Sequence, residues 1–360
     1  MRFKNITTLL CALALISAGL QANEPSSENN PRLKKALKKY PDADTNNDGI
    51  LTVTEARAYE AKMSGGETDE PENQEPEVQN DQEAKPGQRR GFRGTLYTPA
   101  PGVTQKSEVY KTVDGLELAM HLHFPQGWKA TDQRPVMIFF FGGGWKKGTP
   151  EQFIVQANHF AGRGIVTARA NYRIHTEKRG NVLPDKCVED ARSAVRWLRA
   201  NATKLGIDPE KVISSGGSAG GHLAYCTSIK ESVDDPEDDL SISPIPQAMV
   251  LYNPGLFYAS SITEENGLLW ELPAEKLKAI APLEHVDKDT PPAYILFGTK
   301  DGLIRGADEY LKIAKELGIR AEMFTAEGQS HGFFNSEPWM SKTIPVVDDF
   351  LVSLGYLNAQ

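Results

Sequence analysis

Cysteine is scarce in this chain of 360 residues, which contains only Cys11, Cys187 and Cys226. A chain of this length and apolar content can bury a substantial core without disulfides. A disulfide between Cys187 and Cys226 stays open as an alternative in an oxidising compartment, but we favour two buried thiols that pack as small apolar groups. The fold is therefore expected to rest on its hydrophobic core.

An apolar segment long enough to cross a membrane is also absent. The uncharged run at residues 6–20 is shorter than the about 20 apolar residues that a membrane helix needs. Arg2 and Lys4 precede this run and Ala22 offers a small residue for cleavage, so we predict a signal peptide over residues 1–22. Because no convincing lipoprotein box precedes Cys11, we expect a soluble periplasmic or secreted protein with no membrane span.

Positive charge is in deficit, since 48 Asp and Glu residues outnumber 40 Lys and Arg and give a net charge of −8. No basic patch with interleaved aromatic side chains offsets this deficit, which argues against nucleic acid as a partner. Residues 64–90 are acidic, rich in Pro, Gln and Asn, and almost free of large apolar residues. Such a segment cannot bury enough surface to fold, so we predict a flexible, disordered linker over residues 64–104.

A GxSxG motif stands at the centre of the chain, where an apolar run beginning at Val212 leads into Gly216, Ser218 and Gly220. This pattern predicts a buried strand, a sharp turn and then a helix, with Ser218 exposed at the turn as a nucleophile. A Cβ atom at either glycine would collide with the neighbouring strand or helix. Free N–H groups at the helix start favour the negative charge that develops in acyl transfer.

A second strand predicted at residues 135–141 ends in three glycines. Its continuous apolar character is typical of a strand buried on both faces. Glycines let backbone N–H groups approach a substrate closely, so we predict that Gly143, Gly144 and Ala219 form an oxyanion hole for the tetrahedral intermediate.

The serine needs a base and a carboxylate, because its hydroxyl is too weak an acid to ionise unaided. A strand predicted at residues 293–297 delivers Asp301 at its carboxyl end, and a strand at residues 321–324 leads to His331. The order Ser218, Asp301, His331 along the chain is the one expected when the nucleophile follows the fifth strand of an α/β sheet. Other His and Asp side chains are rivals for the base and the carboxylate, but their positions in strands, helices or loops suit these roles less: His121, His123, His159, His175, His222, His285, Asp287, Asp289 and Asp308.

These motifs, at residues 139–145, 216–221, 298–301 and 330–334, resemble the α/β-hydrolase superfamily. The likeness is to the carboxylesterases related to hormone-sensitive lipase and to bacterial acetyl and feruloyl (xylan) esterases. It implies an α/β fold in which helices flank a mostly parallel sheet, a catalytic domain over residues 105–360, and no cofactor for catalysis. Phe141 departs from the family, which usually has His at the start of the glycine motif. That His helps to hold the glycine loop, so the loop's anchor is in question.

The resemblance implies an exported serine carboxylic-ester hydrolase that acts through an acyl-enzyme. An open cleft, inferred from the short segment before the first strand, favours esters on a bulky polymer, so we expect acetyl or feruloyl groups on polysaccharide. The alternatives are a general short-chain carboxylesterase, a serine peptidase and a catalytically dead binding module. We expect the segment at residues 256–291 to shape the pocket and four of its side chains to line it: Leu268, Leu269, Trp270 and Leu272.

A different motif occupies residues 44–55, which supply oxygen donors at the spacing of an EF-hand calcium loop. The expected Ca²⁺ ligands are Asp44, Asn46, Asp48, the Ile50 carbonyl, Thr52 and Glu55. We predict an EF-hand helix-loop-helix segment over residues 23–63. A second copy is absent from the chain although these loops usually pair, so the segment's expected roles are to bind a tethering partner, to dimerise or to rigidify the amino-terminal arm.

Overall fold

The computed structural model describes residues 26–27, 31–52, 55–56, 59, 89–90, 96–97, 100–176 and 182–359. The chain divides into two units, Met1–Ala84 and Lys85–Gln360. The predicted signal peptide and most of the predicted linker lie outside the described residues. Within the predicted linker, β1 (Arg89–Arg90) and β2 (Leu96–Tyr97) form a short antiparallel pair.

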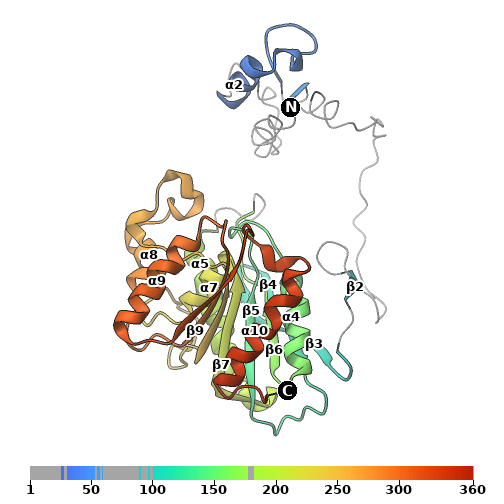
Figure 1. Cartoon of the computed structure of the whole chain (residues 1–360), viewed down its shortest axis with the longest axis vertical. Coiled ribbons are helices and arrows are strands. Elements are labelled where there is room, and N and C mark those ends of the chain that lie inside the picture. The colour runs from blue at the N-terminus through green and yellow to red at the C-terminus, as the bar shows by residue number, and fades with distance from the viewer. Residues whose placement is uncertain are drawn as a thin grey trace. The chain divides into compact units, whose positions relative to one another are not determined.

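The second unit is built on an eight-stranded sheet with the strand order β10-β9-β8-β7-β5-β6-β4-β3 (Figure 1). Strands β5 to β10 are parallel, whereas β4 pairs antiparallel with β6 and with β3. The strands are β3 (Thr104–Val113), β4 (Leu116–Phe124), β5 (Arg134–Phe140), β6 (Val166–Ala170), β7 (Ile207–Gly217), β8 (Ala248–Tyr252), β9 (Ala293–Gly298) and β10 (Ala321–Ala326). The carboxyl ends of the parallel strands meet at one edge, where the loops collect the candidate site.

Helices cover both faces of this sheet, and the alternation of side chains along β5 shows how. Ile138 packs into the cluster that contains α5 (Pro184–Ala200), α7 (Ala219–Cys226) and α9 (Ile304–Leu317). Its neighbour Phe139 packs into the other cluster, with α4 (Ile154–Gly162) and α10 (Trp339–Ser353). The remaining helical segments are η3 (Pro150–Phe153), α6 (Ala202–Leu205), η4 (Ala259–Ser261), η5 (Glu264–Leu269), α8 (Ala274–Ala279), η6 (Pro282–Glu284) and η7 (Phe333–Asn335).

The expected α/β-hydrolase architecture is confirmed. Cys187 and Cys226 are both buried and free, so the disulfide alternative is not realised. The last helix, α10, begins at Trp339, and Pro345 lies inside it. Among the described residues, no helix has the length and apolar character needed to traverse a lipid bilayer.

The first unit has a small core of its own. Its helix α2 (Pro31–Lys39) precedes η1 (Pro41–Ala43), and Leu33 packs with Leu51 and Ala56. Ser26 forms an antiparallel bridge with Thr52, and the Ser27 N–H donates to the Leu51 carbonyl at 2.9 Å. A segment of the same chain therefore occupies a backbone edge within the predicted calcium loop, at Leu51 and Thr52.

Candidate functional site

Ser218 stands at the sharp turn between β7 and α7. Its backbone has φ 54° and ψ −118°, a conformation that costs a non-glycine residue free energy and that is typical of a nucleophile elbow. A Cβ on Gly216 would collide with the Gly220 carbonyl, and one on Gly220 would collide with the carbonyls of Phe140 and Phe141. The expected need for glycine on both sides of the serine is confirmed.

The glycine loop after β5 packs directly against this turn. A Cβ on Gly142 would lie 2.6 Å from the Gly217 carbonyl, and one on Gly143 would collide with the Lys147 carbonyl. Gly143 and Gly144 have φ values of +125° and +64°. In the described structure no acceptor is recorded for the N–H groups of Gly143 and Gly144, and Ala219 is the first residue of α7. These three donors are available for an oxyanion.

Gln152 supplies the anchor that Phe141 does not. Its Oε1 accepts a hydrogen bond from the Gly142 N–H at 2.6 Å, and its Nε2 donates to Asn335 Oδ1 at 3.0 Å. Asn335 Nδ2 in turn donates to the carbonyl of Gly332, the residue after His331. Phe141 itself stacks on Tyr172 with 4.2 Å between ring centroids. One amide side chain therefore links the glycine loop to the histidine loop.

We predict that Gln152→Leu lowers kcat for ester hydrolysis by about 5- to 150-fold, because losing a polar partner costs about 1–3 kcal/mol and releases both loops. The effect should fall mainly on kcat, since the loops hold groups that act in the transition state. The steady-state rate on p-nitrophenyl acetate measures it. Wild-type kcat in a folded Gln152→Leu protein would contradict the anchoring role. Gln126→Leu, at a residue remote from this link, is the matched control.

His331 and Asp301 complete a chain of hydrogen bonds that starts at the serine. His331 Nε2 lies 2.8 Å from Ser218 Oγ, and His331 Nδ1 lies 2.6 Å from Asp301 Oδ2. Asp301 Oδ1 also accepts the Leu303 N–H at 3.0 Å, which fixes the carboxylate. The Asp301 side chain is 2 % exposed and the His331 side chain 43 %. With the Nδ1 proton held by Asp301, Nε2 is free to accept the serine proton.

Four of the other histidine side chains are held in surroundings away from the serine hydroxyl. Burial lowers the pKa of His222 to about 4, and its Nε2 donates to the Ile280 carbonyl at 2.8 Å. Burial, with the charge of Arg169, lowers the pKa of His123 to about 3. His159 bonds to Asp348 and His285 to the Lys278 carbonyl, each at 2.8 Å. His222 is fully buried and stacks on Phe257, so it packs beside the elbow.

Asn253, which follows β8, is a site residue that the sequence analysis missed. It is fully buried, and its Nδ2 lies 3.4 Å from His331 Nε2. Its Oδ1 accepts the Gly332 N–H at 3.3 Å, so its side chain supports the histidine loop. The available signal was its place at the carboxyl end of the strand next to the nucleophile strand.

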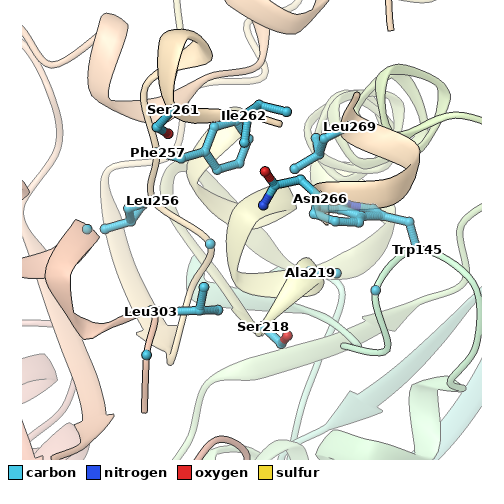
Figure 2. Close-up of a pocket in the computed structure, with 14 residues that line it drawn as sticks. Trp145, Ser218, Ala219, Leu256, Phe257, Ser261, Ile262, Asn266, Leu269 and Leu303 are labelled. Carbon is cyan, nitrogen blue, oxygen red and sulfur yellow. The ribbon is translucent and has the colours of Figure 1, made fainter. Parts of the chain in front are cut away.

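A pocket of about 330 Å³ opens above Ser218 (Figure 2). Its lining residues are mostly apolar and none is ionisable: Gly144, Trp145, Ser218, Ala219, Gly255, Leu256, Phe257, Ser261, Ile262, Asn266, Leu269, Gly302, Leu303 and Gly306. Of the four side chains expected to line it, only Leu269 does so. Leu268 and Leu272 are buried away from it, and Trp270 is 52 % exposed. The residue range was right, but the helical turn of η5 decides which side chains face inward.

A second, more polar groove of about 570 Å³ has His331 as one of its lining residues. The segment from Gly328 to Trp339 forms it, and its polar side chains include Gln329, Ser336 and Glu337. Trp339 contributes a large ring, with the Lys342 ammonium 4.8 Å from its centroid. His331 thus lies between an apolar pocket on the Ser218 side and this polar groove.

The predicted calcium loop in the first unit is folded around its own backbone. Asp44 accepts the N–H groups of Asp48 and Gly49, at 3.3 and 2.8 Å. The pKa of Glu55 is lowered, because hydrogen bonds from Thr52, Asn46 and Thr45 outweigh the desolvation that raises it. Within the described residues, no three acidic, His or Cys side chains are grouped as a ready metal site.

The chain is similar to known esterases. The family described as BD-FAE matches residues 120–249. Esterase 2 of Thermogutta terrifontis, in its apo form, is 38 % identical and superimposes with a TM-score of 0.66 over 72 % of this chain and 97 % of that one. The propionate-bound form of the same enzyme gives 40 % identity and a TM-score of 0.66, with 72 % and 97 % covered.

The curated relatives are more distant. Probable carboxylic ester hydrolase LipM of Mycobacterium tuberculosis is 26 % identical over 54 % of this chain and 48 % of its own length. Carboxylesterase NlhH of the same species is 24 % identical over 62 % of this chain and 73 % of its own. The chain thus spans about half the length of LipM. With 38 % identity across nearly all of a solved esterase and the geometry around Ser218, the chain belongs to the carboxylic ester hydrolases of the α/β-hydrolase fold.

Proposed function

We propose that this protein hydrolyses carboxylic esters through an acyl-enzyme formed on Ser218. The observation that carries the proposal is the hydrogen-bonded chain from Ser218 through His331 to Asp301, beside free glycine N–H groups. Esterase 2 of T. terrifontis is described as phosphorylated by paraoxon, a reaction that requires an activated nucleophile. In this chain Ser218 is the residue placed for that chemistry.

In the first half of the reaction, the Ser218 proton passes to His331 Nε2 while Oγ bonds to the ester carbonyl carbon. The carbonyl oxygen takes up negative charge, which the N–H groups of Gly143, Gly144 and Ala219 stabilise. Each such donor contributes about 2.7–4 kcal/mol in comparable sites. Asp301 stabilises the imidazolium that forms. His331 then gives its proton to the alcohol oxygen as the C–O bond breaks, and a water repeats the sequence on the acyl-enzyme.

The proton transfer from His331 to the alcohol indicates which part of the ester occupies each of the two cavities. His331 must lie next to the oxygen of the leaving alcohol, so the alcohol occupies the groove on the His331 side. The acyl group then occupies the apolar pocket beside Ser218 and Ala219. Its volume suits a short acyl chain, and T. terrifontis esterase 2 has been solved with propionate and with butyrate bound.

The alcohol, we infer, is a sugar of an acetylated polysaccharide. The supporting observation is the groove itself, which is open and polar and includes the aromatic residues Phe333 and Trp339 in its lining. Sugars combine hydroxyls with apolar ring faces, and such a surface suits both. A general short-chain carboxylesterase is the second candidate, which the descriptions of LipM and NlhH favour. The composition of residues 1–22 supports export to the compartment where polysaccharides are found.

Acetate release from acetylated xylan, measured beside hydrolysis of p-nitrophenyl acetate, tests this proposal. Activity on both substrates supports the polysaccharide esterase. Activity on the small ester alone supports the general carboxylesterase, and inactivity on both would overturn the esterase proposal in favour of a peptidase or a binding module.

We further propose that the loop at residues 44–55 binds Ca²⁺. The donor set fits a hard cation, because Asp44, Asp48 and Glu55 provide carboxylates and Asn46 and Thr52 provide neutral oxygens. Loop N–H groups already orient Asp44 and Glu55. Pairing of Ser26 with Thr52 occupies the edge that a second calcium loop would use, which gives a physical reason for a single copy. We also propose that this calcium-binding segment binds a tethering partner.

Terbium luminescence excited through Tyr40 and Tyr59 measures calcium binding by the full chain. We expect Ca²⁺ to displace terbium with an affinity on the order of 10⁻⁴–10⁻³ M, and Glu55→Gln to weaken it at least about tenfold because it removes the charged bidentate ligand. Asp42→Asn, an exposed acid outside the loop, is the control. The rate of ester hydrolysis should stay the same after chelation. Equal affinities in wild type and Glu55→Gln would contradict the assignment.

A further inference from the structure

Asn266 is a polar residue of the acyl pocket, and hydrogen bonds within its own helical turn, η5, fix the orientation of its side chain. It is the third residue of η5, and the residue before η5, Thr263, caps that turn. The Thr263 N–H donates to Asn266 Oδ1 at 2.7 Å, and the Thr263 hydroxyl lies 3.3 Å from the same oxygen. Because a backbone N–H needs an acceptor, the amide oxygen must face Thr263. The amide NH₂ group is therefore turned the other way.

That NH₂ group faces the pocket. Figure 2 shows the Asn266 amide reaching in from above Ser218 and Ala219, with its nitrogen on the side nearer to them. Within the described residues, no protein acceptor is recorded for Asn266 Nδ2. The position is exposed, so the group is accessible to a substrate that enters the pocket.

The other polar side chains of the pocket are bonded elsewhere, shielded or used in catalysis. Ser261 donates its hydroxyl proton to the Tyr258 carbonyl at 2.7 Å. Trp145 Nε1 has no hydrogen-bond partner among the described residues, but the atom is itself buried, so a substrate in the pocket does not contact it. Ser218 is the nucleophile. Among the described lining side chains, Asn266 thus supplies the accessible hydrogen-bond donor without a protein partner, in surroundings made by Phe257, Ile262 and Leu269.

We propose that Asn266 Nδ2 donates a hydrogen bond to an oxygen carried by the acyl group. The pocket then selects short acyl groups that bear an ether, hydroxyl or carbonyl oxygen along the chain over aliphatic groups of the same length. An aliphatic chain would remove water from the Asn266 amide and offer no acceptor in its place. This penalty on the aliphatic chain discriminates more strongly than the hydrogen bond that the oxygen-bearing chain gains. The absence of ionisable side chains in the lining disfavours acyl groups with a second carboxylate. This inference rests on the proposed esterase activity.

Isosteric ester pairs test the proposal, because an ether oxygen replaces a methylene group with little change in shape. The p-nitrophenyl esters of methoxyacetate and butyrate, 3-methoxypropanoate and pentanoate, and 4-methoxybutanoate and hexanoate move the oxygen along the chain. Each kcat/KM is divided by the hydroxide-catalysed rate of the same ester to remove intrinsic reactivity. In the wild type we expect at least one pair to favour the ether by about three- to tenfold, the worth of one neutral hydrogen bond.

Asn266→Asp is the decisive variant. It keeps an acceptor for the Thr263 N–H, so it preserves the cap, but it turns a carboxylate oxygen instead of an NH₂ group into the pocket. We expect the ether preference to fall by at least about tenfold, since a donor is replaced by a charged acceptor. Glu265→Gln, at an exposed residue of the same turn that does not line the pocket, should keep the wild-type ratio. Asn266→Ala should lose the preference without reversing it, and thermal unfolding checks that each variant is folded.

Two results would overturn the inference, and they are distinguishable from failure of the proposed function. If the wild type hydrolysed all six esters and Asn266→Asp gave the same normalised ratios as the wild type, the proposed esterase activity would stand. Asn266 would then have no role in the selection of acyl groups. A wild type that hydrolyses none of the six esters would overturn both.

Discussion

Ser218→Ala is expected to lower kcat for p-nitrophenyl acetate by about 10⁴- to 10⁶-fold, because it removes the atom that bonds to the acyl carbon. The residual rate would come from the N–H groups of the glycine loop and from substrate binding, which the substitution leaves in place. Alanine retains the Cβ atom, so the strained backbone at φ 54° is unchanged and the fold should persist. Circular dichroism and thermal unfolding check this.

Ser215→Ala provides the matched control on the same strand. Its hydroxyl is fully buried and donates to the Val250 carbonyl at 2.7 Å, away from the substrate. Its loss should cost about 1 kcal/mol of stability and leave kcat unchanged. If Ser218→Ala kept more than about one hundredth of the wild-type kcat, the nucleophile would lie elsewhere.

Asp301→Asn is expected to lower kcat by about 10⁴-fold while KM changes little. The side chain keeps its shape, and its oxygen can still accept the Leu303 N–H, which bonds to Asp301 Oδ1 at 3.0 Å. Its amide NH₂ group would then face His331 Nδ1 as a donor. The imidazole would have to place its proton on Nε2, where it can no longer accept the proton of Ser218.

The control for this substitution is Asp308→Asn. Asp308 was a rival for the triad carboxylate, and it lies exposed on α9. Its substitution should leave kcat and KM at the wild-type values. A folded Asp301→Asn enzyme within tenfold of wild type would show that Asp301 does not set the tautomer of His331.

The sequence determined the fold class and the residues near Ser218 because both depend on local patterns. Apolar runs of strand length alternate with helical periods, and each candidate residue follows a strand directly. Parallel strands carry their carboxyl ends to one edge of the sheet, so a serine, an aspartate and a histidine far apart in the chain were expected to meet.

The tertiary structure alone decided which side chains support and surround that centre. Gln152 replaces the missing histidine by reaching across to Asn335, 183 residues away in the chain, and no local pattern predicts such a contact. The pocket wall was expected to include Trp270, but a short helical turn points Asn266 inward instead. Periodicity places a residue on a strand or helix, whereas the direction of one side chain in a loop depends on hydrogen bonds that only the folded chain brings together.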